Sequence, residues 1–263
     1  MSDFLPTERH KPRTSLAHYI IFLYGPPKIG KTTFVSQIRD TLFLATEPGT
    51  AALEVFDLTI SSWTDFTTAL EALANSPEGK QYKAVCIDTV GLLWDLLLAD
   101  ICRRKGWDDV NEGGFAEGYT LAKRELNVAI SQLRALEKLI IFVCHERRVA
   151  EEDDNGKRTG ATMITCDLPN SARKVFLAQS DFVVRAFLDE DNERSLRLQP
   201  LRSADEYIEC GCRGDINRPM PDTVPLSFKE FHKAFATAFG APKKKRSVKA
   251  KTNQVITQQE ASA

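Results

Sequence analysis

Apolar and polar positions follow two different patterns along the first two thirds of the chain. Four continuous apolar runs predict strands buried on both faces, at residues 19–24, 41–45, 84–87 and 139–144, and a fifth, short strand is predicted at 58–61. Stretches with helical spacing lie between them and predict helices at residues 33–40, 62–74, 92–101 and 122–136. Because strands and helices follow one another in turn, the pattern predicts an α/β fold with a mostly parallel sheet and helices on both faces.

The pattern changes after residue 181. Three further strands are predicted in succession, at residues 182–188, 195–201 and 207–212, and an amphipathic helix follows at 228–239. Strands that follow one another without helices predict antiparallel pairing near the carboxyl end. We therefore expect one domain over residues 18–240, with a flexible arm at 1–17 and a disordered basic tail at 241–263.

The charge of the chain is unevenly distributed. The full chain has a net charge of −1, whereas residues 241–263 contain six basic residues and one acidic residue, a net charge of +5. Residues 1–240 therefore carry −6, which indicates a mildly acidic body with a basic tail. The amino-terminal segment lacks the order of a signal peptide, and no apolar run is long enough to cross a bilayer. We expect a cytoplasmic protein without a membrane partner.

The cysteines do not indicate a metal site. Cys210 and Cys212 form the single Cys-x-Cys of the sequence, without a second pair or a histidine at metal-ligand spacing. Alternate positions of a strand account for them, so we do not expect them to bind a metal.

A phosphate-binding motif stands between the first predicted strand and the first predicted helix. The sequence GPPKIGKT matches G-x-x-x-x-G-K-[ST], and the strand and helix on its two sides are the context that this motif requires. Its glycines allow the loop amides to turn inward around an anion, and the helix that follows directs its amino terminus to the same point. The predicted nucleotide-binding residues are Gly25, Pro26, Pro27, Lys28, Ile29, Gly30, Lys31, Thr32 and Thr33.

A metal-bound triphosphate requires further oxygen ligands beside this loop. Lys31 is predicted to contact the β- and γ-phosphates, and the Thr32 hydroxyl to bind Mg²⁺. The sequence KAVCIDT places Asp88 at the carboxyl end of a buried strand, where ligands of parallel sheets gather. We expect Asp88 to hold Mg²⁺ through water, although a strand-ending aspartate that caps the next turn is the alternative. ATP and Mg²⁺ are thus the expected cofactors.

Hydrolysis also requires a group that orients or deprotonates water. Glu47 follows the strand after the P-loop helix, and Pro48 disfavours helical geometry at Glu47, so its carboxylate should lie at the sheet edge. A simple turn residue in Glu-Pro-Gly is the alternative interpretation.

The order of these parts resembles the RecA-type recombinase core, and the resemblance extends over residues 19–201. It implies that Glu47 occupies the catalytic glutamate position, and that His145, after the strand LIIFVC, lies where the family usually has a glutamine that senses the γ-phosphate. Histidine can donate to a phosphate oxygen, but its charge varies near neutral pH, and a strand-end histidine with a structural partner is the alternative. On this basis the catalytic residues are Glu47, Lys31 and His145. The resemblance also implies a homo-oligomer with sites between subunits, to which a neighbour would contribute a cation, with Arg197, Arg202 and Arg213 as candidates.

The compact chain is also similar to phage-encoded RecA-like ATPases of the single-strand annealing class, which would place it in the host cytoplasm. The resemblance implies two loops directed toward single-stranded DNA, at residues 103–118 and 147–170. Both contain Arg and Lys, and Trp107 in the first could stack on a base. Acidic residues interrupt both segments, so a solvated loop of mixed charge is the alternative. The basic tail could add affinity, and a single-strand binding protein is a possible partner.

Two other functions compete with recombination. An AAA+ remodelling ATPase shares the Gly-Pro-Pro-x-x-Gly-Lys-Thr loop, but Thr89 rather than Glu follows Asp88, and strands rather than a helical lid are predicted in the carboxyl third. A nucleotide-switched binding module would bind ATP and recruit a partner without useful turnover.

Overall fold

The computed structural model describes residues 13–114, 116–152, 156–214 and 218–240. The tail predicted at 241–263 and most of the arm predicted at 1–17 lie outside the described residues. A 3₁₀ helix, η1 (Leu16–His18), precedes the first strand, and Leu16 is buried against the core.

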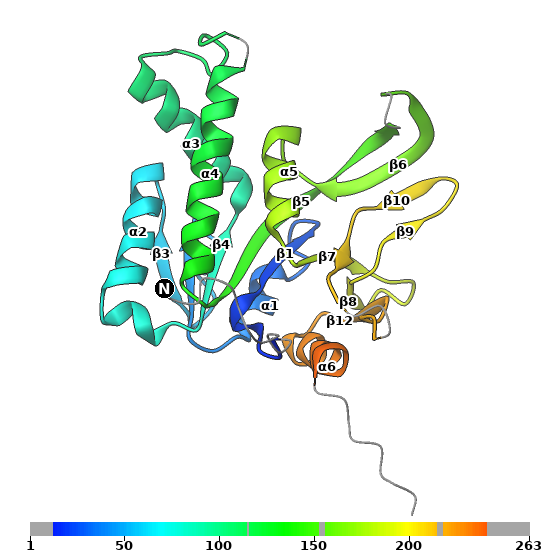
Figure 1. The fold of residues 1–263 in the computed structure, drawn as a ribbon. Helices are drawn as coiled ribbons and strands as arrows, with labels where there is room; N and C mark the ends of the chain where they lie inside the picture. Colours follow the sequence, from blue (N-terminus) through cyan, green and yellow to red (C-terminus); the bar gives the residue numbers. More distant parts are fainter. Residues whose placement is uncertain (1–12, 115, 153–155, 215–217, 241–263) are drawn as a thin grey trace, which may run out of the picture.

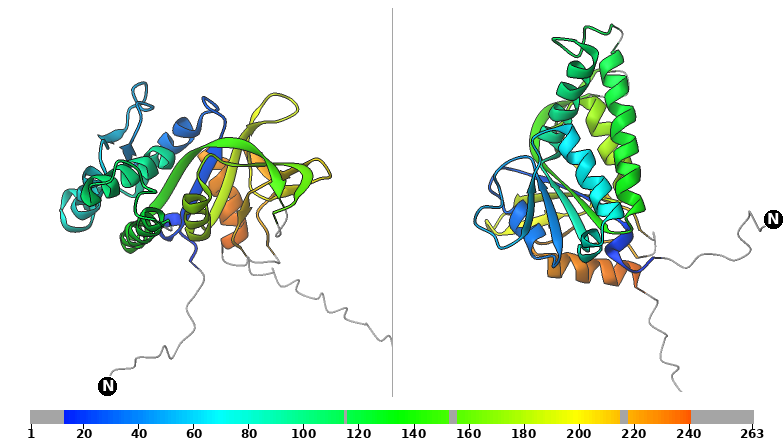
Figure 2. Two further views of the ribbon diagram at one scale, coloured as in Figure 1. Left: turned by 90° about the horizontal axis from the view of Figure 1, so that it is seen from above. Right: turned by 90° about the vertical axis from the view of Figure 1, so that its left-hand side faces the viewer.

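One twisted sheet forms the centre of the molecule (Figures 1 and 2). Its main path runs in the order β12-β8-β7-β1-β5-β4-β2-β3. These strands are β1 (Ile20–Gly25), β2 (Thr41–Ala45), β3 (Phe56–Thr59), β4 (Ala84–Asp88), β5 (Leu139–Glu152), β7 (Phe182–Leu188), β8 (Arg194–Arg197) and β12 (Thr223–Pro225). The pairs from β7 to β3 are parallel, and β8 and β12 join antiparallel. The predicted α/β fold, with a mostly parallel sheet and antiparallel strands near the carboxyl end, is confirmed.

Helices cover both faces of the sheet, as predicted. In β1, Ile20, Phe22 and Tyr24 belong to one buried cluster and Ile21 and Leu23 to the other, because successive side chains of a strand point to opposite faces. The first cluster packs under α2 (Trp63–Asn75), α3 (Val90–Lys105), α4 (Glu117–Ala135) and α5 (Asn170–Gln179), and the second under α1 (Lys31–Ser36) and α6 (Phe228–Phe239). A further 3₁₀ turn, η2 (Glu78–Gln81), follows α2. In the described ranges, none of the helices has the length and apolar character that crossing a membrane requires.

Capping residues determine the start of α2. The Ser62 Oγ accepts a hydrogen bond from the Asp65 amide at 3.0 Å, and Asp65 Oδ2 accepts one from the Ser61 amide at 3.0 Å. This reciprocal pairing satisfies amides at the helix start that have no partner within the helix, and it fixes where α2 begins.

The largest difference from prediction concerns the strand expected at 139–144. β5 continues to Glu152 because β6 (Arg158–Cys166) pairs with it antiparallel, with Glu146 opposite Cys166. The two strands form a hairpin that extends beyond the rest of the sheet (Figure 1). The prediction of a loop over 147–170 is therefore wrong for most of its length, since β6 and the start of α5 also fall within it. Because this segment is rich in charged residues, its sequence does not show the apolar pattern that predicts strands.

Several other element boundaries also differ. α1 ends at Ser36 rather than at residue 40, and α3 continues four residues beyond the predicted end at 101. The strand predicted at 195–201 is two strands in the structure, β8 and the short β9 (Leu201–Arg202). The strand predicted at 207–212 is also two strands, β10 (Glu206–Ile208) and β11 (Gly211–Cys212). β10 pairs with both β6 and β9, and β11 pairs with β7.

Candidate functional site

The loop of the GPPKIGKT sequence joins the end of β1 to the start of α1. Gly25 is required by a close approach, because a Cβ there would lie 2.4 Å from the carbonyl oxygen of Ala186 in β7. Gly30 has a φ of 107° and precedes α1, and no side chain caps the helix start. The amide groups at the start of α1 therefore have no side-chain acceptor at the cap position and are available to an anion.

Lys31 places a buried cation beneath this loop. Its side chain is 6% exposed, and its Nζ donates to the carbonyl oxygens of Gly25 at 2.9 Å and Pro26 at 2.8 Å. Burial lowers the pKa of the Lys31 ammonium, and the charge of Asp88 partly opposes this. An anion on the loop would compensate the buried charge.

The predicted metal ligands meet at the carboxyl edge of the sheet. Thr32 Oγ1 donates to Asp88 Oδ2 at 2.8 Å, although the two residues come from α1 and β4. Burial raises the pKa of the Asp88 carboxyl, and the hydrogen bond from Thr32 partly offsets that effect. The chain at Gly49 passes beside the pair, since a Cβ there would lie 3.7 Å from Thr32 Oγ1.

Glu47 and His145 face one another on the same side of the loop. Glu47 Oε1 lies 3.6 Å from His145 Nε2, and His145 Nδ1 lies 3.5 Å from Lys31 Nζ. Both side chains are about a third exposed, at 35% and 37%, so the pair is open to solvent. Gly25 pairs in register with His145, which explains why His145, within β5, lies beside the loop.

Thr46 fixes Glu47 relative to the end of β4. Its hydroxyl accepts from the Thr89 amide at 2.8 Å and donates to the Thr89 carbonyl at 3.0 Å, and its amide donates to the Asp88 carbonyl at 2.8 Å. These three bonds join the segments that carry the two carboxylates, Glu47 and Asp88.

A single cavity of about 540 Å³ brings these groups together. It is lined by Pro27, Lys28, Gly30, Lys31, Thr32, Thr33, Glu47, Pro48, Gly49, Asp88, His145 and Arg194. Of the residues predicted from the sequence, Gly25, Pro26 and Ile29 do not line it. Gly25 and Pro26 accept hydrogen bonds from Lys31, and Ile29 is buried in the core.

Arg194 is the charged residue of the cavity lining that the sequence did not indicate. It belongs to no motif, and β8 brings it to the loop from a distant part of the chain. The three arginines proposed to act on a neighbouring subunit do not line this cavity. Arg197 lies over the Phe187 ring, Arg202 pairs with Glu151, and Arg213 pairs with Asp181.

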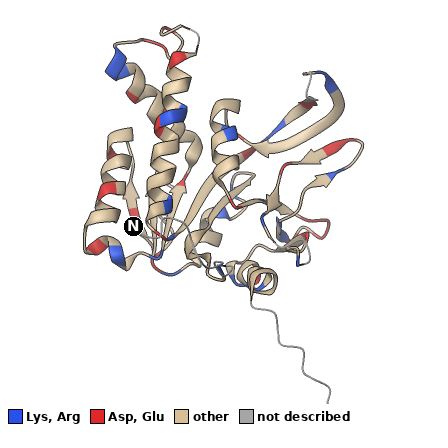
Figure 3. Ribbon diagram, in the orientation of Figure 1, with Lys and Arg blue, Asp and Glu red and all other residues tan. Residues whose placement is uncertain are grey.

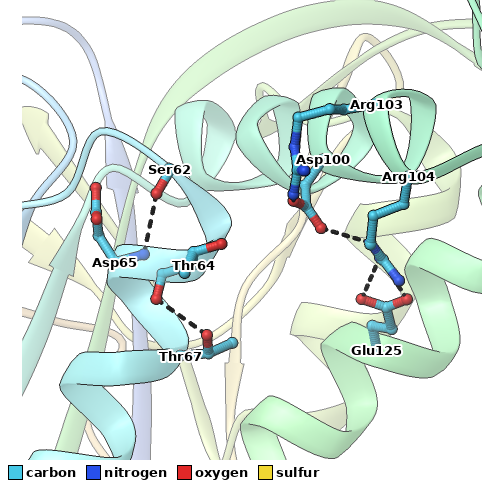
Figure 4. A network of polar contacts seen from close by, with 8 residues as sticks. All are labelled: Ser62, Thr64, Asp65, Thr67, Asp100, Arg103, Arg104 and Glu125. Carbon is cyan, nitrogen blue, oxygen red and sulfur yellow. Dashed lines mark hydrogen bonds and ion pairs between the residues drawn. The ribbon is translucent and has the colours of Figure 1, made fainter. Parts of the chain in front are cut away.

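The segment 103–118, expected as a loop, begins in the last turn of α3. Arg103 and Arg104 pair with Asp100, and Arg104 also pairs with Glu125 of α4 (Figure 4). Charges of both signs mark the outer ends of α3 and α4 (Figure 3). Side-chain pairs three and four residues apart support a helix, which explains why α3 continues beyond the predicted end.

Trp107 has a structural role in the turn that joins α3 to α4. A Cβ at Gly113 would lie 2.4 Å from its ring, and one at Gly118 would lie 3.4 Å away, so these glycines leave room for it. The ammonium of Lys105 lies 5.4 Å from the Trp107 ring centroid. The ring is thus partly buried within its own segment.

Cys210, just before β11, and Cys212, in β11, do not line this cavity. Burial raises the pKa of the Cys210 thiol to about 12 and also raises the pKa of Cys212. Across the parts of the chain that the structure describes, no group of three metal-ligating side chains occurs.

Comparison with protein-family models identifies a family for this chain. The protein-family model described as "AAA domain" matches residues 17–205, which include the whole cavity and most of the sheet. No curated protein matches the chain.

Proposed function

The chain belongs to the AAA domain family of P-loop ATPases, and from this premise we propose that it binds magnesium and ATP in the cavity and hydrolyses ATP. One observation carries the proposal. One cavity contains the buried Lys31 cation, the hydrogen-bonded pair of the Thr32 hydroxyl and the Asp88 carboxylate, and a second carboxylate, Glu47.

The described residues fit a magnesium nucleotide. The Lys31 ammonium is buried yet hydrogen-bonds to neutral carbonyl oxygens, so bound phosphates would compensate its charge. Thr32 and Asp88 offer a hydroxyl and a carboxylate oxygen 2.8 Å apart, and hard oxygen ligands are those that Mg²⁺ prefers. We assign Thr32 as a direct ligand and Asp88 as a ligand through water. Bound magnesium would neutralise the charge of the β- and γ-phosphate oxygens.

Glu47 and His145 are assigned to the chemical step. Glu47 orients the attacking water and accepts its proton as the new P–O bond forms and the bond to ADP breaks. His145, whose Nε2 lies 3.6 Å from Glu47 Oε1, donates a hydrogen bond to a γ-phosphate oxygen. Thr46 keeps Glu47 in place, because it joins the Glu47 segment to the end of β4.

We further propose that ATP binding is coupled to single-stranded DNA in recombination or annealing, in a homo-oligomer of the RecA-like kind. The support is the continuity of β5, which contributes His145 to the cavity and then extends into the β5–β6 hairpin. Arg148 and Arg158 are exposed on this hairpin, where they can neutralise phosphates. A γ-phosphate hydrogen-bonded to His145 would therefore act on β5, which carries Arg148 and pairs with the strand that carries Arg158.

Binding of a labelled single-stranded oligonucleotide tests this coupling. We expect tighter binding with ATP than without it, and an affinity that falls steeply with salt, because each phosphate contact releases counterions and adds roughly −0.7 to the logarithmic salt slope. The double variant Arg148→Ala, Arg158→Ala should flatten the slope. Arg124→Ala, which removes a charge from the exposed surface of α4, should leave it unchanged. Absent or salt-insensitive binding by the wild-type protein rejects the DNA proposal but leaves the ATPase proposal intact.

An AAA+ remodelling activity is the second candidate, since the family match concerns the AAA domain as such. It is less well supported, because in the residues that the structure describes β7 to β12 and α6 follow the core, where a remodeller would have a helical lid. ATPase rates separate the two: stimulation by single-stranded DNA favours recombination, and stimulation by a protein substrate favours remodelling. Nucleotide binding without turnover would instead favour a switched binding module.

A further inference from the structure

Arg194 approaches the P-loop from the β8 side. Its Nη1 lies 3.5 Å from the position that a Cβ of Gly30 would occupy, and its side chain lines the 540 Å³ cavity. Within the described part of the chain, the Arg194 guanidinium has neither a carboxylate partner nor a hydrogen-bond acceptor. The nearby Arg185, by contrast, pairs with Glu146 at 2.9 Å. Arg194 is thus a cation beside the phosphate loop whose donors are available to a ligand.

The backbone of Arg194 is held on both sides. Arg194 pairs with Leu188 across the β7–β8 ladder, and its carbonyl accepts from the Leu226 amide at 2.8 Å. The turn before it is organised by Asp189, whose carboxylate accepts from the Glu193 amide at 2.8 Å and from the Ser195 hydroxyl at 2.9 Å. These bonds hold the backbone at the start of β8 in place, so binding a ligand through the guanidinium would not require the backbone to become ordered.

The sheet order tells which part of a nucleotide Arg194 would meet. Strand β1, which leads into the P-loop, has β5, β4 and β2 on one side and β7 and β8 on the other. The groups assigned to magnesium and the γ-phosphate belong to the first side: Asp88 ends β4, His145 lies in β5, and Glu47 follows β2. Arg194 comes from the second side. We therefore expect Arg194 to face the α- and β-phosphates rather than the γ-phosphate.

Charge within the cavity supports a role for this cation. The charged side chains in the lining are Lys28, Lys31 and Arg194 against Glu47 and Asp88, with His145 counted as neutral. The net charge of the lining is +1 with Arg194 and zero without it. A magnesium-bound di- or triphosphate is an anion, so the charge of Arg194 adds to the attraction that Lys31 and the loop amides provide.

We propose that Arg194 binds the α- and β-phosphates of the nucleotide within its own chain and acts as a nucleotide-positioning residue. The proposal rests on the proposed ATP site and names a cation of that site. Because this contact is already made with the bound nucleotide before the reaction, we expect it to contribute to binding more than to the chemical step.

Four variants test this assignment. We expect Arg194→Ala to raise the dissociation constants of ADP and of a slowly hydrolysed ATP analogue by the same factor, about tenfold or more, because a charge-assisted hydrogen bond to phosphate is lost. KM for ATP should rise by a similar factor while kcat at saturation stays near the wild-type value. Arg194→Lys should recover part of the affinity, since it keeps the charge but loses the forked geometry. Arg124→Ala is the control for charge, and Lys31→Ala is the control for the site itself.

The outcomes distinguish the assignment from the ATP site that it presupposes. The role of Arg194 is overturned if Arg194→Ala has a normal melting temperature and wild-type affinities for both nucleotides, and Lys31→Ala in the same assay loses nucleotide binding. A loss of kcat with unchanged affinities also overturns it, because Arg194 would then act on the γ-phosphate. If the wild-type protein itself binds neither nucleotide, the proposed ATP site fails first.

Discussion

Replacing Lys31 with alanine is expected to abolish nucleotide binding, with an affinity loss of more than about a hundredfold. The Lys31 ammonium is the buried cation of the P-loop, held by the carbonyl oxygens of Gly25 and Pro26 at 2.9 and 2.8 Å. Its burial means that its attraction to phosphate is little screened by water. A titration of a fluorescent nucleotide, followed by competition with unlabelled ATP, measures the loss.

Two controls make the Lys31 result specific. Lys123→Ala removes an equal charge from the exposed surface of α4 and should leave the affinity unchanged. Lys31→Gln keeps a donor for the two carbonyl oxygens but lacks the charge, so it should fold and still lose nucleotide. Wild-type affinity in a folded Lys31→Gln protein would contradict the role given to the ammonium.

Replacing Glu47 with glutamine is expected to separate binding from turnover. The carboxamide has nearly the shape of the carboxylate but cannot accept a proton, so kcat should fall by roughly 10²–10⁴-fold. Affinity for ATP should be retained or slightly increased, because a negative charge near the γ-phosphate is removed. Phosphate release under saturating ATP gives the rate, and the nucleotide titration gives the affinity.

Glu54→Gln is the matched control for Glu47. Glu54 is an exposed carboxylate of the same segment that lies outside the cavity, so its replacement should change neither rate nor affinity. If the Glu47 variant hydrolyses ATP at the wild-type rate, the assigned base is wrong. The ATP site itself would then remain, with another group activating the water.

The central strands and the phosphate loop could be predicted because local sequence determines them. Continuous apolar runs gave β1, β2 and β4 within about one residue, and the glycine and lysine spacing of the P-loop matched a defined backbone shape. Asp88 could be placed because a strand-ending aspartate in a parallel sheet must lie at the carboxyl edge, and Thr32 meets it there.

Features that depend on contacts between segments, rather than on the pattern within one segment, could not be predicted. The β5–β6 hairpin is charged and has no clear alternation, and its two strands are extended because they bond to one another. Arg194 belongs to no motif, and only the fold of the β7–β8 turn brings it beside Gly30. The packing of Trp107 against Gly113 and Gly118 within its own turn is a contact of the same kind.

Isothermal calorimetry of the folded wild-type protein with a slowly hydrolysed ATP analogue tests the central claim most directly. We predict saturable heat that corresponds to one nucleotide per chain, weakened when magnesium is withheld and absent in Lys31→Gln. The absence of any saturable heat with magnesium and the analogue, in protein shown to be folded, would contradict the account of the cavity as an ATP site.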